Sequence, residues 1–81
     1  MTRQFDMAIL GSWLRAKRRK CGLNVNDVQD RAGIPNATLW RIENGSGRLL
    51  LIDAIAICDL YGVELAELVK IARYETTGDF A

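Results

Sequence analysis

Apolar residues recur at spacings of three and four along most of the chain, and glycines interrupt this pattern at short intervals. Such spacing predicts helices, because residues three or four apart lie on one side of a helix. No segment shows the alternation with a period of two that is typical of a strand. We therefore expect an all-α fold of five short helices, at about residues 7–20, 25–32, 35–44, 50–61 and 63–74.

Turn-forming residues separate these segments. Gly22 and Gly33 each follow a predicted helix, at the position where a left-handed residue commonly ends one. Asn24 precedes the second segment, where its side chain can cap the helix N-terminus. Pro35 suits the start of the third segment. Residues 25–44 therefore predict two short helices joined by a glycine-containing turn, which is a helix-turn-helix.

The fourth segment carries more apolar residues than one buried face requires. The side chains expected to face the core are those of Leu51, Ala54, Ile55 and Cys58. The excess predicts a homodimer contact centred on Leu49, Ile52 and Ala56. One alternative stays open, in which the C-terminal tail covers the same surface through Tyr74 or Phe80.

With 81 residues the chain has the size of one small domain, and we expect residues 1–74 to form it, with a short tail at 75–81. There is no histidine, and Cys21 and Cys58 do not form a CxxC pair, so a zinc site would lack ligands. Two reduced cysteines in or near the core are the favoured interpretation, and a disulfide between them is the alternative. No nucleophile–base set is evident, which predicts a protein that is not an enzyme and uses no cofactor, metal or small-molecule ligand.

Hydropathy and charge indicate which partners the protein meets. No apolar run approaches the roughly 18 residues of a membrane span, and the N-terminus lacks the order of a signal peptide, so we expect a cytoplasmic protein without a membrane partner. Residues 1–20 contain six basic residues and one acidic residue, whereas residues 49–81 contain two basic and six acidic residues. A basic end suits a polyanion such as DNA. A solvated basic helix explains the same charges equally well.

Three stretches of sequence carry a resemblance to a known family. They are LGSWLRAKRRKCGL (10–23), AGIPNATLWRIENG (32–45) and YGVELAEL (61–68). With them, the chain resembles the Cro/repressor-type, XRE-like helix-turn-helix DNA-binding proteins from residue 10 to residue 68. The resemblance implies a five-helix, lambda-repressor-like domain whose third helix recognises double-stranded DNA. It further implies a transcriptional regulator, of the phage or prophage repressor type, that binds a pseudo-palindromic operator as a homodimer.

The same resemblance implies roles for individual residues. Arg18 and Glu43 fall where the family has a largely buried ion pair that joins the first helix to the recognition helix. The chain departs from the usual pattern at Val25 (commonly Gln), Gln29 (commonly a small residue) and Pro35 (commonly Ser or Thr). Asn24 and Asn26 are therefore expected to make the phosphate contact that the family's glutamine makes.

One face of the predicted third helix carries side chains suited to reading bases. Steps of about 100° per residue turn Leu39 and Ile42 inward. The outward groups expected to read the groove are Asn36, Ala37, Trp40 and Arg41. Arginine can grip guanine, asparagine can pair with adenine, and alanine can contact a thymine methyl group. Phosphate contacts are expected from Asn24, Asn26, Asn44, Ser46 and Arg48.

Two questions stay open at the level of sequence. Trp40 either packs against DNA or folds over the loop at 45–47, and Arg41 contacts a base, a phosphate or only solvent. A second class of function is also compatible with the chain. In that alternative the protein is an interaction module, such as an antitoxin or adaptor, that holds a protein partner through Trp40 and the apolar surface at 49–52.

Overall fold

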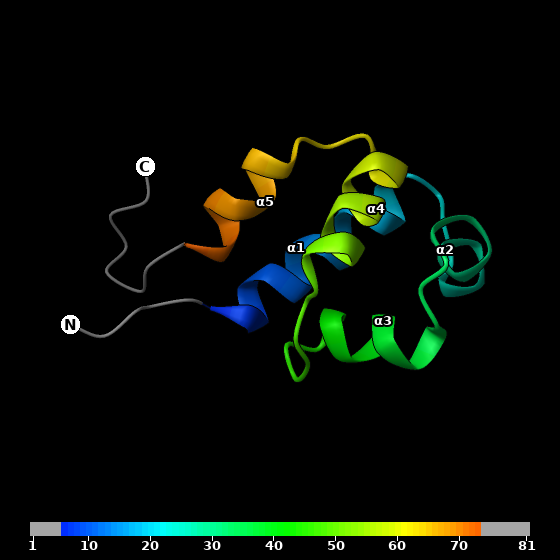
Figure 1. Ribbon diagram of the computed structural model, residues 1–81, viewed down its shortest axis with the longest axis horizontal. Helices are drawn as coiled ribbons and strands as arrows, with labels where there is room; N and C mark the ends of the chain where they lie inside the picture. The colour runs from blue at the N-terminus through cyan, green and yellow to red at the C-terminus, as the bar shows by residue number, and fades with distance from the viewer. Residues whose placement is uncertain (1–5, 74–81) are drawn as a thin grey trace.

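The computed structural model describes residues 6–73, which form five α-helices and no strand (Figure 1). The helices are α1 (Met7–Lys20), α2 (Val25–Ala32), α3 (Asn36–Glu43), α4 (Leu51–Tyr61) and α5 (Leu65–Ala72). The all-α prediction is confirmed, and the bounds of α1 and α2 agree with it to the residue. Helix α5 is shorter than predicted, because Glu64 is still extended and Arg73 already ends the helix. The expected tail, with Tyr74 and Phe80, lies outside the described residues.

Local side-chain and glycine chemistry sets the ends of the helix-turn-helix. Asn24 and Asp27 form a reciprocal capping box, in which each side chain accepts a hydrogen bond of 2.9 Å from the other residue's backbone N–H. At the other end of α2, Gly33 adopts a left-handed conformation with φ 72°, and its N–H donates to the carbonyl of Gln29. The chain therefore reverses within Gly33–Pro35 and delivers α3 beneath α2.

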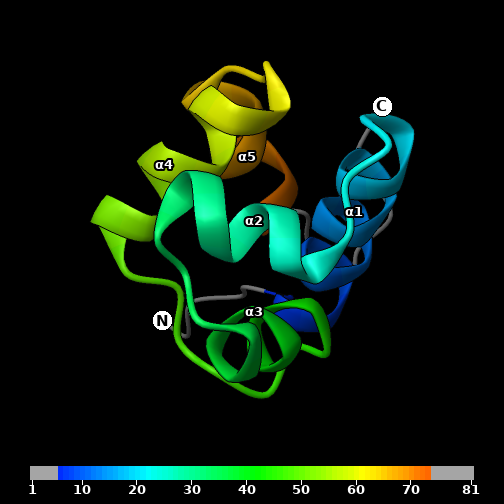
Figure 2. The same cartoon turned by 90° about the vertical axis from the view of Figure 1, so that its right-hand side faces the viewer.

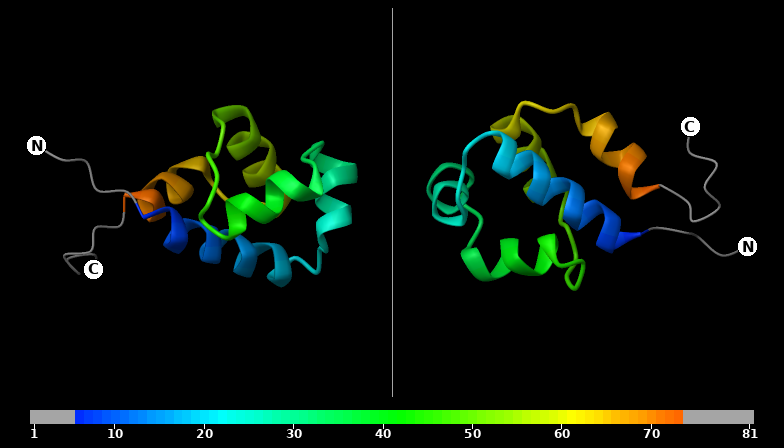
Figure 3. Two further views of the ribbon diagram at one scale, coloured as in Figure 1. Left: turned by 90° about the horizontal axis from the view of Figure 1, so that it is seen from below. Right: turned by 180° about the vertical axis from the view of Figure 1, so that it is seen from behind.

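The helices pack around one core as a ring of neighbours, in which α1 lies against α3 and α5, and α2 and α4 close the ring on the other side. Seen from behind, α1 crosses the molecule with α5 on one side and α3 on the other, while α2 lies across the end (Figure 3, right). The view in Figure 2 separates the two outer faces, with α3 along the bottom and α4 at the left. The buried apolar side chains that hold this arrangement are those of Leu10, Leu14, Val28, Ile34, Leu39, Ile42, Ala54, Ile57, Cys58, Tyr61 and Leu68.

Helices α1 and α3 approach most closely at Gly11. A Cβ atom placed on this glycine would lie 2.5 Å from the carbonyl oxygens of both Ile42 and Glu43. Those oxygens belong to the backbone and cannot rotate away. Glycine is therefore the residue that lets the recognition helix lie directly against α1.

The predicted inward stripe of α4 is wrong for two of its four members. Ala54 and Cys58 are buried, but Leu51 and Ile55 are 68% and 43% exposed. Ile57 and Tyr61 occupy the core instead. Because α4 is apolar on nearly every side, the sequence pattern does not define its rotation, and packing against α2 and α5 decides it.

The two cysteines are both free. Cys58 belongs to the core, and its burial raises the pKa of the thiol. Cys21 is exposed at the end of α1, with its Sγ 3.5 Å from the carbonyl oxygen of Tyr61. Of the two cysteines expected in or near the core, Cys58 is therefore in it, whereas Cys21 is exposed and contacts the buried Tyr61 only through that residue's carbonyl.

Candidate nucleic-acid interface

A buried ion pair fixes the recognition helix to α1. Arg18 presents its Nε 2.7 Å from Oε2 of Glu43 and its Nη2 3.0 Å from Oε1, a bidentate fork. The remaining Nη1 donates to the carbonyl of Leu23, at the entrance to α2. The hydrogen bond with Glu43 raises the pKa of the guanidinium. One arginine thus ties together three successive parts of the domain: α1, the loop before α2, and the end of α3.

A second arginine shares the same carboxylate. Arg15 lies one turn earlier on α1, and its Nε is 3.4 Å from Oε1 of Glu43. Its side chain is 37% exposed, so this longer contact is screened by solvent and adds little to stability. Sequence analysis counts Arg15 only as one of the six basic residues of 1–20, without a partner in the protein. Arg15 and Arg18 are three residues apart, so both lie on one face of α1. This spacing is the sequence signal from which a shared partner could have been predicted.

The outward face of α3 is free in the structure. Leu39, Ile42 and Glu43 are buried on one side of this helix. On the opposite side, the exposed residues are Ala37, Trp40, Arg41 and Asn44. The buried side of α3 (Leu39, Ile42 and Glu43) is called the packed arc here, and the exposed side (Ala37, Trp40, Arg41 and Asn44) the open arc. The open arc carries a methyl group, an aromatic ring, a guanidinium and an amide.

Trp40 is 63% exposed, which is unusual for the largest apolar side chain. The loop that follows α3 packs instead against Arg41, because a Cβ on Gly47 would lie 2.9 Å from the Cβ of Arg41. Of the two open interpretations, the one in which Trp40 folds over this loop receives no support from the contacts. The indole remains available to a partner.

The loop after α3 is tied to the end of that helix. Nδ2 of Asn44 donates to the carbonyl of Trp40 over 2.7 Å, and Oγ of Ser46 lies 3.4 Å from the carbonyl of Arg41. The same two carbonyls also accept backbone N–H groups, from Asn44 and Ser46 respectively, so each of them is bonded twice. Asn44, Ser46 and Arg48 are exposed, so they border the open arc of α3 as a group.

The start of α3 differs from the prediction. Asn36 is half-buried, its Nδ2 donates to Oδ1 of Asn26 over 2.8 Å, and its Oδ1 is covered without a partner among residues 6–73. Its backbone N–H donates to Oε1 of Gln29 over 3.0 Å. This is not the free, outward adenine reader that the sequence predicts. Gln29 instead supplies the N-terminal cap that Pro35 lacks, a role that only the crossing of α2 over α3 creates.

Apart from Arg18, which bonds to Glu43, the basic run at the end of α1 lies away from α3. Figure 2 shows this end of α1 at the top of the molecule and α3 at the bottom. Arg19 and Lys20 are exposed there, and the ammonium of Lys17 sits 5.5 Å from the centre of the Trp13 ring. These cations complement the helix C-terminus and add a field at long range, but they do not line the open arc.

No helix within 6–73 has the length and apolarity needed to cross a membrane. In the same part of the chain, no group of three His, Cys, Asp or Glu side chains is placed to hold a metal ion.

Five α-helices, of which α2 and α3 form a helix-turn-helix, make up the fold of the Cro/repressor-type, XRE-like DNA-binding regulators. The chain belongs to the helix-turn-helix domain family, whose model matches residues 9–70. A comparison with curated protein sequences gave no match.

Solved structures of regulators share the fold. The restriction-modification controller protein C.AhdI from Aeromonas hydrophila superposes with a TM-score of 0.73 at 22% identity, over 78% of this chain and 96% of that one. The clp gene regulator ClgR from Corynebacterium glutamicum gives a TM-score of 0.75 at 18% identity, over 88% and 76%. The BldD DNA-binding domain from S. venezulae gives 0.68 at 26% identity, over 78% and 94%.

Proposed function

We propose that this helix-turn-helix protein is a cytoplasmic transcriptional regulator, of the phage or prophage repressor type, that binds a pseudo-palindromic operator in double-stranded DNA as a homodimer. The observation that carries the proposal is the open arc of α3, formed by Ala37, Trp40, Arg41 and Asn44. Arginine and asparagine are ordinary at a surface, but a tryptophan that is 63% exposed is not. Together these side chains match what a helix needs when it enters the major groove.

Within that arc, Arg41 is the strongest candidate for reading a base. Its exposed guanidinium can donate two parallel hydrogen bonds to O6 and N7 of guanine. Ala37 offers a methyl group to thymine, and Trp40 lies at the groove edge, where its ring packs on sugar and its N–H reaches a phosphate.

Phosphate contacts would flank the reading helix on both sides. Asn24 and Asn26 are exposed at the start of α2, where backbone N–H groups also point outward. Asn44, Ser46 and Arg48 lie beyond the other end of α3. Contacts at both ends of a groove-bound helix fix its register, while the bases between them provide specificity.

The homodimer proposal rests on an apolar surface along α4. The exposed fractions are 59% for Leu50, 68% for Leu51, 74% for Ile52 and 43% for Ile55. Leu49 and Ala56, expected at the centre of the contact, are half-buried, so the surface is better described by Ile52 with Leu51 and Ile55. Figure 2 shows α4 at the side of the molecule rather than beside α3, which leaves the reading helix free when α4 meets a second copy.

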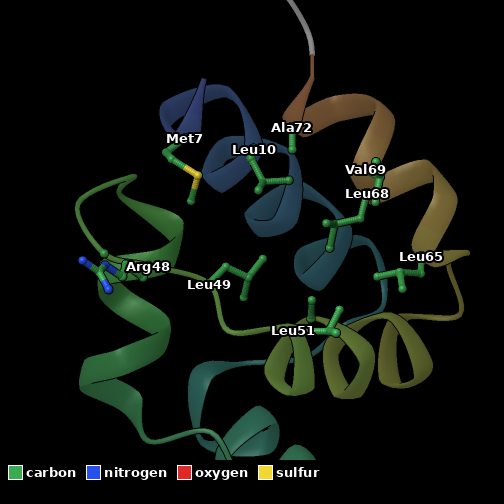
Figure 4. A pocket seen from close by; sticks show the side chains of 11 residues that line it. Met7, Leu10, Arg48, Leu49, Leu51, Leu65, Leu68, Val69 and Ala72 are labelled. Atoms are coloured by element: carbon green, nitrogen blue, oxygen red, sulfur yellow. The ribbon is translucent and has the colours of Figure 1, made fainter. Parts of the chain in front are cut away.

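A groove extends this surface toward α5. It has a volume of about 680 Å³ and lies between α1, the start of α4, and α5 (Figure 4). Apolar side chains line most of it, among them Leu51 from α4 and Val69 from α5, which is also 39% exposed. A second copy packed on α4 would remove part of this wall from water, and each 100 Å² of apolar area buried contributes about 2.5 kcal/mol before the cost of association.

Dimeric binding has a geometric consequence. Two recognition helices related by a two-fold axis reach successive major grooves when they lie about 34 Å apart, which requires an operator with inverted half-sites. Repression would then follow from occupancy of the operator, with protein concentration as the control.

Selection of bound sites from random duplex DNA, followed by a salt titration on the selected site, tests the proposal. We expect inverted half-sites about one helical turn apart, and an affinity that falls steeply with salt because phosphate contacts release counterions. Duplex binding no better than background, together with a stable protein complex through the Leu51–Ile55 surface, would instead support the antitoxin or adaptor function.

Arg41→Ala should weaken binding to the selected operator by about 1–3 kcal/mol and relax the preference at one base pair of each half-site. The comparison is with Arg19→Ala, which removes the same charge from the end of α1, away from α3. That control should lower affinity slightly and equally on all sequences. Equal effects of the two variants on base preference would show that Arg41 does not read a base.

Ile52→Glu should shift the protein from dimer to monomer in sedimentation velocity, because a charge would be buried in the contact. Ala16→Glu introduces the same charge at an exposed position of α1 and should leave the sedimentation coefficient unchanged. A wild-type protein that is monomeric at all concentrations, with or without DNA, would remove the dimer from the proposal.

A further inference from the structure

The groove between α1, the start of α4, and α5 has walls that are mostly apolar. Leu10, Leu51 and Val69 are among the side chains that line it (Figure 4). The exposed fractions of Leu51 and Val69 are 68% and 39%, so apolar wall area is in contact with water. Ile52 is not one of the lining residues, so an occupant of the groove leaves the centre of the proposed dimer contact free.

One charged residue lines this groove. Arg48 is exposed and lies at the edge, with its guanidinium beyond the apolar walls (Figure 4). Neither of the ion pairs within residues 6–73 includes Arg48, because both are made by Glu43. The occupant that suits the groove therefore combines a large apolar side chain with a carboxylate next to it.

The C-terminal segment of the chain has this combination. Residues 74–81 lie outside the described part of the chain and read YETTGDFA. Asp79 directly precedes Phe80, which is the one large side chain of the segment without a polar atom. Gly78 comes just before the pair and allows the backbone to turn. The pair Asp79–Phe80 thus matches the groove in both apolar character and charge.

The segment also begins at the groove. Ala72, the last residue of α5, is one of the lining residues. Phe80 is seven positions after Arg73, and seven residues span up to about 23 Å, which is enough to cross a groove of about 680 Å³. A segment joined by so short a linker meets its site at an effective concentration of about millimolar, which favours it over an unlinked partner.

We propose that residues 74–81 fold back over the groove, with the ring of Phe80 on the apolar walls and the carboxylate of Asp79 beside the guanidinium of Arg48. The groove is then a docking site for the chain's own C-terminal segment. Its consequence for DNA rests on the proposed function, in which Arg48 contacts a phosphate. Asp79 and the phosphate compete for one guanidinium, so the segment forms an autoinhibitory contact that DNA must displace.

Nuclear Overhauser effects measured on the whole chain test the docking directly. The chain has two phenylalanines, so labelled phenylalanine gives a simple spectrum, and Phe80→Ala identifies the Phe80 signals. We expect contacts from the Phe80 ring to the methyl groups of Leu49 and Val69, with shifts of those methyl signals in Phe80→Ala. If the ring shows no such contacts and Phe80→Ala leaves the methyl signals unchanged, the segment does not dock.

A sample that mixes labelled and unlabelled chains distinguishes a segment docked on its own chain from one exchanged between two copies. We expect the Phe80 contacts within a chain, at every protein concentration. Contacts found only between chains would overturn the proposal, because a second copy then supplies the occupant. Glu75→Gln is the matched control, since it removes the same charge from the other end of the segment and should keep the Phe80 contacts.

Operator binding tests the competition for Arg48. Asp79→Asn should bind the selected operator about threefold more tightly, the scale expected when an exposed ion pair is removed. Glu75→Gln should have a smaller effect, because Glu75 has no place beside Arg48 in the docked segment. In an Arg48→Gln background, Asp79→Asn should bring no further gain. The same gain with and without Arg48 would show that the two residues do not meet.

The two measurements separate this inference from the proposed function. The Phe80 contacts are observed without DNA, so a protein that selects no operator overturns the proposed function, and the contacts alone then decide the docking. An operator-binding protein without Phe80 contacts overturns the docking and leaves DNA recognition intact.

Discussion

Glu43→Leu should lower the free energy of unfolding by about 3–5 kcal/mol, the largest loss expected from a single substitution in this domain. Arg18 is 9% exposed, so removal of Glu43 leaves a buried guanidinium without a counter-charge. For a domain of this size, such a loss corresponds to a fall in melting temperature of at least about 12 °C. Thermal and urea unfolding followed by circular dichroism would measure it.

A double variant distinguishes the cost of breaking the ion pair from the net contribution of the intact pair to the free energy of unfolding. Arg18→Met should be destabilising too, but less than Glu43→Leu, because Arg15 still lies 3.4 Å from the Glu43 carboxylate. Arg18→Met with Glu43→Leu should recover much of the loss, since two apolar side chains of similar volume need no partner. Glu67→Gln removes an exposed carboxylate from α5 and should change stability by no more than about 0.5 kcal/mol. Equal stability of the single and double variants would contradict a coupled pair.

Gly11→Ala should cost about 3 kcal/mol, at the upper end of the range for overpacking, because the added methyl group meets two backbone oxygens. The intrinsic helix preference works in the opposite direction, since alanine is favoured over glycine by about 1 kcal/mol within a helix. The contact between α1 and α3 therefore decides whether the substitution stabilises or destabilises the domain. The added methyl group would push α3 away from α1. This displacement should weaken operator binding, even though Gly11 lies on the packed side of α3, away from the open arc.

Ser12→Ala is the matched control, because it adds helix preference at the neighbouring, exposed position without touching α3. It should leave stability unchanged or raise it slightly. If Gly11→Ala is as stable as Ser12→Ala, the two helices can separate at little cost, and the close approach does not constrain the domain.

Local signals in the sequence predicted most of the fold. Asn24, Gly33 and the apolar spacing of α1 and α2 act within a few residues, so they can be recognised without knowledge of the rest of the chain. The resemblance to XRE-like proteins implied the Arg18–Glu43 contact, which joins residues 25 positions apart. Propensity and spacing alone do not identify a pair at that separation.

The errors concern features that depend on how helices cross. Helix α4 has apolar side chains nearly all round, so several rotations bury similar areas, and contacts with α2 and α5 choose among them. Asn36 lies on the outward side of a helical wheel, but its environment is set by Asn26 and Gln29 on a different helix. A wheel describes one helix at a time and cannot show such a network.

The division of α3 into a packed arc and an open arc also bears on how such proteins diverge. Leu39, Ile42 and Glu43 hold the helix in place, while Trp40 and Arg41 make no buried contact with the core. Substitutions at the open positions can therefore accumulate at little cost in stability. The surface that α3 presents to a partner can change in chemistry while the position of the helix in the domain stays the same.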